Sequence, residues 1–125
     1  MYNVPRQVVD MNRFKELQVW QLSIGLAVMI YDVTKSFPKE EKFGLSSQIN
    51  RSVISISSNI AEGAGRNSNK EFIQFLSIAL GSSFEVESQL IISEKIGFIN
   101  IETLNLLLEQ LHHIQNMIIK LKKSL

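Results

Sequence analysis

The sequence holds 125 residues, of which 45% are hydrophobic, and its formal net charge is +1. This length fits one domain with its own core, and the balanced charge excludes a global field that would by itself attract nucleic acid or a membrane. There is no cysteine, which excludes disulfides, thiolate metal sites and cysteine nucleophiles.

The first helix is predicted over residues 17–35, because five apolar side chains recur every three or four residues and share one face. They are Leu17, Trp20, Ile24, Ala27 and Tyr31. The helix ends ahead of Pro38, since the residue before a proline avoids helical backbone angles. We expect Trp20 to fill a core site.

The second helix is predicted over residues 43–62, again from apolar residues at helical spacing. They are Ile49, Val53, Ile56 and Ile60. Residues 38–41 ahead of it are interpreted as a separate turn. Gly63 stands where a left-handed residue would cap the end of this helix.

The third helix, over residues 69–96, begins with a capping box in which Ser68 is the N-cap and Glu71 reaches back. Gly97 is predicted to cap its end. Its seam is Phe72, Phe75, Leu76, Ala79, Ser83, Val86 and Leu90. The fourth helix, over residues 101–123, follows Asn100 as N-cap. Its seam is Leu104, Leu107, Leu111, Ile114, Ile118, Leu121 and Leu125.

Four such helices joined by short loops predict an all-α fold, an antiparallel up-down-up-down four-helix bundle over residues 14–125. Residues 1–13 form an N-terminal arm. Helices one and four carry apolar residues beyond their seams, namely Leu22, Leu26, Val28, Met29, Ile30, Leu106, Leu108, Met117 and Ile119. This excess predicts a homo-oligomer of closed symmetry, although scattered surface leucines would give the same pattern.

The spacing of histidines, carboxylates and serines gives little support for a catalytic or metal site. Glu109 and His112 form one Glu-x-x-His pair, whereas a di-iron bundle needs two such pairs and a further glutamate from each of two helices. No serine stands in a nucleophile-elbow context, and no glycine-rich phosphate loop is present. We therefore expect no enzyme activity, no catalytic residue, no metal and no cofactor.

Polar residues crowd the end of the second helix. Asn59 and Glu62 share one face, and a glutamate at a helix C-terminus opposes the helix dipole. Glu62 therefore needs a partner, for which Arg66, Arg13 or the N–H groups that open the third helix are candidates. We interpret these polar residues as a hydrogen-bonded cluster that fixes the turn between the second and third helices. The alternative is a ligand pocket.

One end of the predicted bundle collects basic residues from three segments. The predicted nucleic-acid-binding residues are Arg13, Lys15, Arg66, Lys70, Lys120, Lys122 and Lys123. Against them stand the carboxylates Glu16, Glu62 and Glu71. Seven cations minus three carboxylates leave an excess of four positive charges, whereas the whole chain carries +1. Such a patch favours RNA or DNA binding, although lysines also suit the last turn of a helix.

Sequence motifs over residues 14–123 resemble the four-helix-bundle family related to proteins encoded in intervening sequences of bacterial 23S ribosomal RNA genes. The matching segments are 17–20 (LQVW), 43–45 (FGL), 59–63 (NIAEG) and 81–82 (GS). The resemblance adds Gln48, Arg51 and Glu85 to Asn59 and Glu62 as a structural polar cluster. Ser57 departs from the family, which often has proline there.

The family resemblance implies a four-helix bundle that assembles as a cyclic, pentameric homo-oligomer, with no agreed catalytic residues. Some related bundles look like accessory proteins of diversity-generating retroelements, which engage nucleic acid and a reverse transcriptase. Our leading hypothesis is a nucleic-acid-associated accessory protein, and the alternative is a scaffold that recruits another protein. The chain has no signal-peptide core and no apolar run of about 18 residues, so we expect a cytoplasmic protein without a membrane partner.

Overall fold

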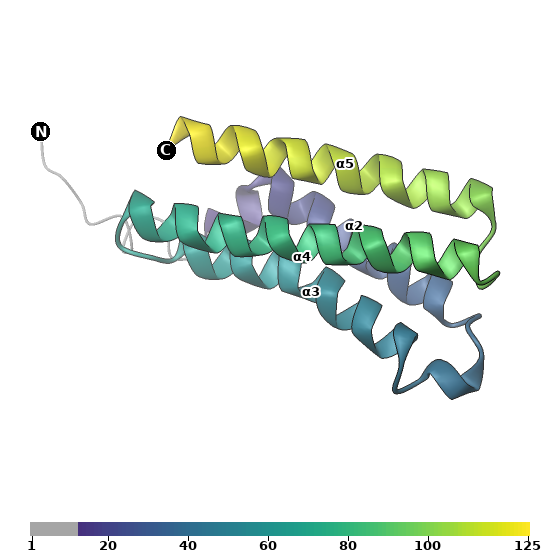
Figure 1. Ribbon diagram of the computed structural model, residues 1–125. Helices are drawn as coiled ribbons and strands as arrows, with labels where there is room; N and C mark the ends of the chain where they lie inside the picture. Colours follow the sequence, from purple (N-terminus) through teal and green to yellow (C-terminus); the bar gives the residue numbers. More distant parts are fainter. Residues whose placement is uncertain (1–12) are drawn as a thin grey trace, which may run out of the picture.

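Four long α-helices lie side by side in the protein (Figure 1). The computed structural model describes residues 13–125, so the predicted arm lies outside the described residues except for Arg13. The helices are α2 (Gln18–Thr34), α3 (Leu45–Ala64), α4 (Asn69–Lys95) and α5 (Ile101–Ser124). Two short 3-10 helices are η1 (Arg13–Glu16) and η2 (Lys39–Glu41). The described residues contain no strand, so the predicted all-α fold with four main helices is confirmed.

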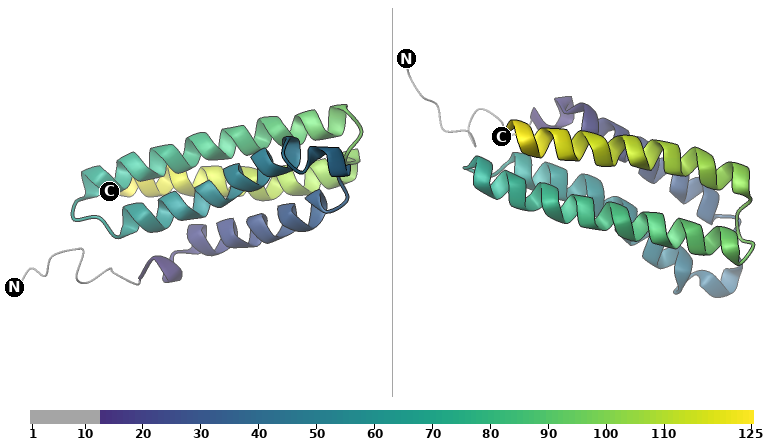
Figure 2. Two further views of the ribbon diagram at one scale, coloured as in Figure 1. Left: turned by 90° about the horizontal axis from the view of Figure 1, so that it is seen from below. Right: turned by 45° about the horizontal axis from the view of Figure 1, so that its top comes forward.

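Each helix contacts the next one along the chain, and α5 also contacts α2, which fits a bundle. The contact between α3 and α4 is the most extensive. In Figures 1 and 2, the α3–α4 connection lies at the same end as η1 and the end of α5. The α2–α3 and α4–α5 connections lie at the opposite end. The predicted helix ranges differ from the observed bounds by two residues or fewer.

The predicted caps of α4 and α5 are present. The Ser68 hydroxyl accepts the Glu71 backbone N–H at 3.2 Å, and the Asn100 side chain accepts the N–H of Thr103 at 2.8 Å. Gly97 has a φ of 85°, and the Phe98 N–H behind it reaches back 2.8 Å to the Ser93 carbonyl. This closing pattern satisfies carbonyls that the helix end would leave unpaired.

The predicted core face of α2 is wrong by about one residue, or about 100° around the helix axis. The buried residues are Val19, Ser23, Leu26, Ile30 and Thr34. Ile24 and Tyr31 are 38% and 48% exposed, and Trp20 is only half-buried. Polar residues occupy the true core face because their hydroxyls bond locally: Ser23 donates to the Val19 carbonyl at 2.7 Å.

The predicted seam of α3 is confirmed, since Ile49, Val53, Ile56 and Ile60 are fully buried. The predicted role of Gly63 is wrong. Gly63 lies inside α3, which continues to Ala64, and among the described glycines only Gly97 has a positive φ. The reason for a glycine at 63 is space, because a Cβ there would lie 2.7 Å from Phe75 Cβ and 2.9 Å from Phe72 Cδ1.

Most of the apolar residues that predicted an oligomer belong to the protein's own core. Leu26 and Ile30 are buried, and four more pack against the core, namely Leu22, Met29, Leu108 and Met117. Val28, Leu106 and Ile119 remain exposed. The main seams of α4 and α5 are buried, apart from half-buried Phe75 and Leu121 and exposed Leu125.

Helix α4 also exposes apolar side chains on its outer face, which the sequence reasoning missed. They include Ile78, Phe84, Ile91 and Ile92. Among the described helices, α4 is long and apolar enough to cross a membrane by length and composition, with 33% of its most apolar window buried. The core helices of soluble proteins have the same length and composition.

Candidate functional site

The basic residues predicted from sequence come from three segments that meet at one end of the protein (Figure 1). Arg13 and Lys15 lie in η1, and Lys70 lies in the first turn of α4. Arg66 lies in the α3–α4 connection, while Lys120, Lys122 and Lys123 lie at the end of α5. We call this surface the basic end.

The carboxylates of the basic end are already engaged. Glu16 lies 3.4 Å from the Arg13 guanidinium, and Glu62 lies 2.7 Å from that of Arg66. The Glu71 carboxylate accepts a hydrogen bond from the Ser68 hydroxyl at 3.1 Å.

Five cations of the basic end have no ion-pair partner within residues 13–125. They are Lys15, Lys70, Lys120, Lys122 and Lys123. Lysine is a flexible, hydrated point charge. A set of lysines without ion-pair partners among residues 13–125 therefore suits an extended anion more than a precisely shaped ligand.

The predicted polar cluster does not gather in one place. Asn59 donates to the Ser55 carbonyl at 2.8 Å and to its hydroxyl at 3.0 Å, and the Ser55 hydroxyl meets that of Ser82 at 2.8 Å. This chain of bonds ties α3 to α4. Glu62 bonds Arg66, whose guanidinium lies 4.7 Å from the centre of the Phe75 ring.

The three other members of the predicted cluster lie elsewhere. Gln48, Arg51 and Glu85 are exposed. Gln48 precedes Glu62 by 14 residues on α3, which is about 21 Å along a helix axis. Arg51 contributes to a pocket between α2 and α3.

Sequence reasoning missed a polar contact between α4 and α5. Glu87 accepts a bond from the Gln115 side chain at 2.9 Å and lies 3.1 Å from His112 Nε2. The Gln115 bond lowers the pKa of Glu87, partial burial opposes this, and His112 adds to the lowering. The sequence paired His112 with Glu109 on its own helix. Within residues 13–125, no three His, Cys, Asp or Glu side chains come together as metal ligands would.

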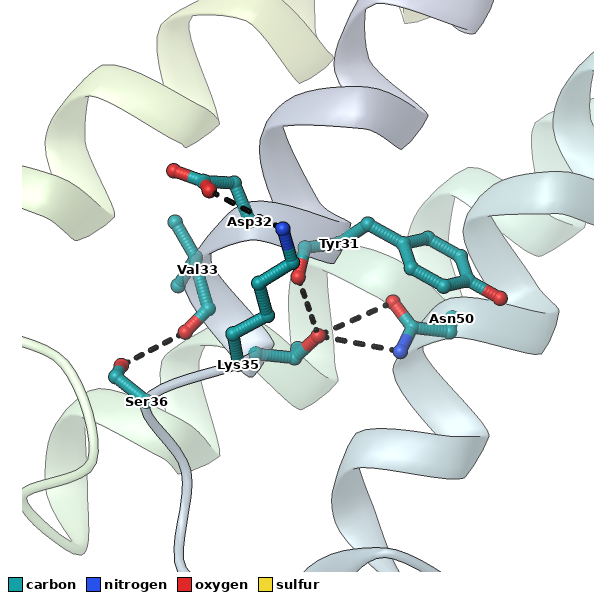
Figure 3. Close-up of polar contacts among 7 residues, drawn as sticks. Tyr31, Asp32, Val33, Lys35, Ser36 and Asn50 are labelled. Atoms are coloured by element: carbon teal, nitrogen blue, oxygen red, sulfur yellow. Dashed lines mark hydrogen bonds and ion pairs between the residues drawn. The ribbon is translucent and has the colours of Figure 1, made fainter.

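A pocket of about 730 Å³ opens between the end of α2 and the start of α3. Figure 3 shows its side near Tyr31, Lys35 and Asn50. Four cations line it, namely Lys35, Lys39, Lys42 and Arg51. The sequence offered no signal for this pocket beyond the lysines, because its walls come from two helices and their connection.

A comparison with protein-family models shows which family the chain belongs to. The family model described as 23S rRNA-intervening sequence protein matches residues 15–120. The chain belongs to the 23S rRNA-intervening sequence protein family. The family prediction made from sequence motifs is therefore confirmed.

A solved structure resembles this 23S rRNA-intervening sequence protein. It is a protein of unknown function from the S23 ribosomal protein family of Bacteroides thetaiotaomicron. It is 30% identical, with a TM-score of 0.76 over 84% of this chain and 98% of the other. No curated protein matches the chain. The family match leaves Arg13, Lys122 and Lys123 outside its range, so part of the basic end lies beyond the matched region.

Proposed function

We propose that this 23S rRNA-intervening sequence protein is a non-enzymatic, cytoplasmic accessory protein that binds nucleic acid through its basic end. The observation that carries the proposal is the set of five lysines that have no ion-pair partner among residues 13–125, at an end whose carboxylates are already engaged. We infer an antiparallel up-down-up-down order of the helices, because this order brings η1, the α3–α4 connection and the end of α5 together at one end of the bundle.

The physical basis of the proposal is the release of counterions from a phosphate backbone. Each phosphate that a lysine neutralises frees a condensed ion, so the affinity falls steeply as salt rises. Five lysines on three segments would contact phosphates over an extended surface without reading bases. We therefore expect weak dependence on nucleotide sequence and strong dependence on ionic strength.

We infer that the protein assembles into a homo-oligomer, and the family resemblance favours a cyclic pentamer. Support comes from the outer faces of α2 and α4, where Val28 and Phe84 are 65% and 51% exposed. A ring of aligned subunits would repeat the basic end around its rim and raise the local positive potential.

The test is RNA binding as a function of salt. We would measure anisotropy of a fluorescent single-stranded RNA with hydroxyl groups at both ends. The variant K120E/K122E/K123E should lose most of the binding and flatten the salt dependence. The matched control K35E/K39E/K95E makes the same charge change at the opposite end and should bind like the unaltered protein.

Two outcomes would refute the proposal. One is the absence of RNA binding at low salt, and the other is an equal loss in both triple variants, which would reflect net charge alone.

The alternative function is a scaffold that recruits another protein. The exposed apolar side chains of α4 favour it, because Phe84 and Ile91 lie seven residues apart and so share one helix face, and exposed apolar patches often mark protein interfaces. Co-purification of a protein that is lost in F84E, together with no RNA binding by the unaltered chain, would select this function.

A further inference from the structure

The pocket is lined by the end of α2, the start of α3 and their connection. This connection lies at the opposite end of the protein from the basic end (Figure 1). We propose that the pocket binds a nucleoside phosphate through a terminal phosphate group, either as a free nucleotide or at the end of an RNA chain. This inference does not depend on the proposed role of the basic end, because the two surfaces share no residue.

The first observation is the charge of the walls. Four basic side chains line the pocket, and among residues 13–125 no carboxylate does. Lys35 lies 3.9 Å from Asp32, but both side chains are about four-fifths exposed, at 78% and 81%, so water screens this pair strongly. The remaining three cations, Lys39, Lys42 and Arg51, have no ion pair within the described part of the chain.

Glu41, a carboxylate of the connection, is directed to the start of α3. Glu41 Oε2 accepts the backbone N–H of Leu45 at 2.9 Å and so caps the start of α3. Gly44 makes room for it, since a Cβ at this position would lie 2.6 Å from that oxygen. The Glu41 charge is thereby used at the helix start and does not line the pocket.

The second observation is a set of polar side chains in the pocket wall. Thr34 is buried, and its hydroxyl lies 3.1 Å from the Asn50 amide nitrogen and 3.1 Å from the Tyr31 carbonyl oxygen (Figure 3). The same hydroxyl lies 3.4 Å from Asn50 Oδ1, and these contacts tie Asn50 on α3 to Thr34 on α2. An amide nitrogen carries two N–H groups, so Asn50 can bond a ligand while it keeps its contact with Thr34. Ser46 and Ser47 add hydroxyls from the first turn of α3.

The third observation is an apolar wall beside the charges. Tyr31, Phe37 and Ile54 line the same pocket, and Tyr31 is 48% exposed. An exposed aromatic ring offers a stacking surface for a base. The volume of about 730 Å³ lies within the range of small-molecule sites, roughly 300–1,000 Å³.

These three observations together indicate which class of ligand the pocket binds. A terminal phosphate carries about −1.5 to −2 charge at pH 7, as phosphorylated side chains do, whereas an internal phosphodiester carries one negative charge. Arginine pairs with phosphate through two parallel bonds, and lysines add point charges. Cations next to an aromatic and amide-bearing wall therefore match a nucleoside phosphate better than inorganic phosphate or an uncharged nucleoside.

The experiment is isothermal titration of the full chain with AMP, adenosine and inorganic phosphate. We expect AMP to bind once per chain with a Kd below about 1 mM, and adenosine and phosphate to bind at least ten times more weakly. K42E/R51E should weaken AMP binding at least tenfold, and Y31A should weaken it while Y31F does not. The control K122E/K123E, at the basic end, should leave AMP binding unchanged.

A second titration distinguishes the two sources of the ligand. A short RNA with a 5′-phosphate should compete with AMP if RNA ends enter the pocket, whereas the same RNA with a 5′-hydroxyl should not. Competition by neither RNA assigns the pocket to free nucleotides.

The proposal is overturned if AMP does not bind saturably, or if K42E/R51E and K122E/K123E weaken it equally. Circular dichroism of each variant shows that the helices remain folded. Loss of RNA binding in the basic-end variants has no bearing on this result, so the two proposals fail separately.

Discussion

Substitution of Gly63 by alanine tests the close contact between α3 and α4. In an open helix position, glycine to alanine stabilises by up to about 1 kcal/mol. At Gly63 the new methyl group would lie 2.7 Å from Phe75 Cβ, 2.9 Å from Phe72 Cδ1 and 3.3 Å from the Phe72 carbonyl oxygen. Carbon atoms in favourable contact lie about 3.5–4.0 Å apart, so the helices must separate locally.

The size of the effect follows from two opposing terms. Phe75 Cβ is fixed to the backbone, so a change of rotamer cannot relieve that contact. Overpacking of this kind costs typically about 1–3 kcal/mol, and we expect the upper part of that range because two contacts are below 3.0 Å. The propensity gain is small because Gly63 lies in the last turn of α3. The net loss should be about 1–2 kcal/mol.

The assay is urea unfolding followed by circular dichroism, at one fixed chain concentration because an assembly would make stability depend on concentration. Gly25→Ala and Gly81→Ala are matched controls, since an added Cβ meets nothing within 4 Å at either position. Both should raise the unfolding midpoint, whereas Gly63→Ala should lower it. The reasoning fails if Gly63→Ala is as stable as the controls.

Three further predictions follow from other contacts. Glu87 has a lowered pKa, so its bonds to α5 stabilise the fold above about pH 4.5 and are lost as the pH falls through the pKa of the folded state. The difference in unfolding midpoint between the unaltered protein and E87Q should therefore shrink from pH 6 to about pH 3. A difference that stays constant over this range would contradict the prediction. Asn100→Ala removes the cap of α5 and should cost about 1 kcal/mol by urea unfolding, with no change if the cap is dispensable. V28E and F84E should each reduce the mass measured by light scattering without loss of helicity, while an unchanged mass would place the subunit contacts elsewhere.

The parts of the fold that sequence predicts well are those with strong contrast between apolar and polar positions. Along α5, Leu104, Leu107, Leu111 and Ile114 recur on one face and are buried. The caps at Ser68 and Asn100 are equally local, because each depends on residues no more than three positions away.

Helix α2 lacks that contrast. Apolar side chains surround it, and the true core face contains Ser23, whose hydroxyl is satisfied within its own helix. Hydrophobic spacing alone therefore selected a face that runs through exposed Ile24 and Tyr31. Only the positions of α3 and α5 decide which side of α2 is buried, and a pattern within one helix does not contain them.

The candidate sites also differ in how far the sequence alone predicts them. The end of the bundle that carries Lys70 and Lys120 follows from helix order. The pocket depends on how the Tyr31 side of α2 meets the Arg51 side of α3. The Glu87–His112 contact depends on the relative rotation of α4 and α5. Neither rotation can be read from spacing, so both contacts required the structure.

The contact between α3 and α4 bears on the order in which the chain folds. These two helices share the most extensive contact in the protein, and only residues 65–68 separate them along the chain. A short connection costs little loop-closure entropy, and local contacts speed folding. We expect this helical hairpin to form early and to provide the template onto which α2 and α5 dock, so kinetic φ-values should be highest at Ile56, Ile60 and Leu76.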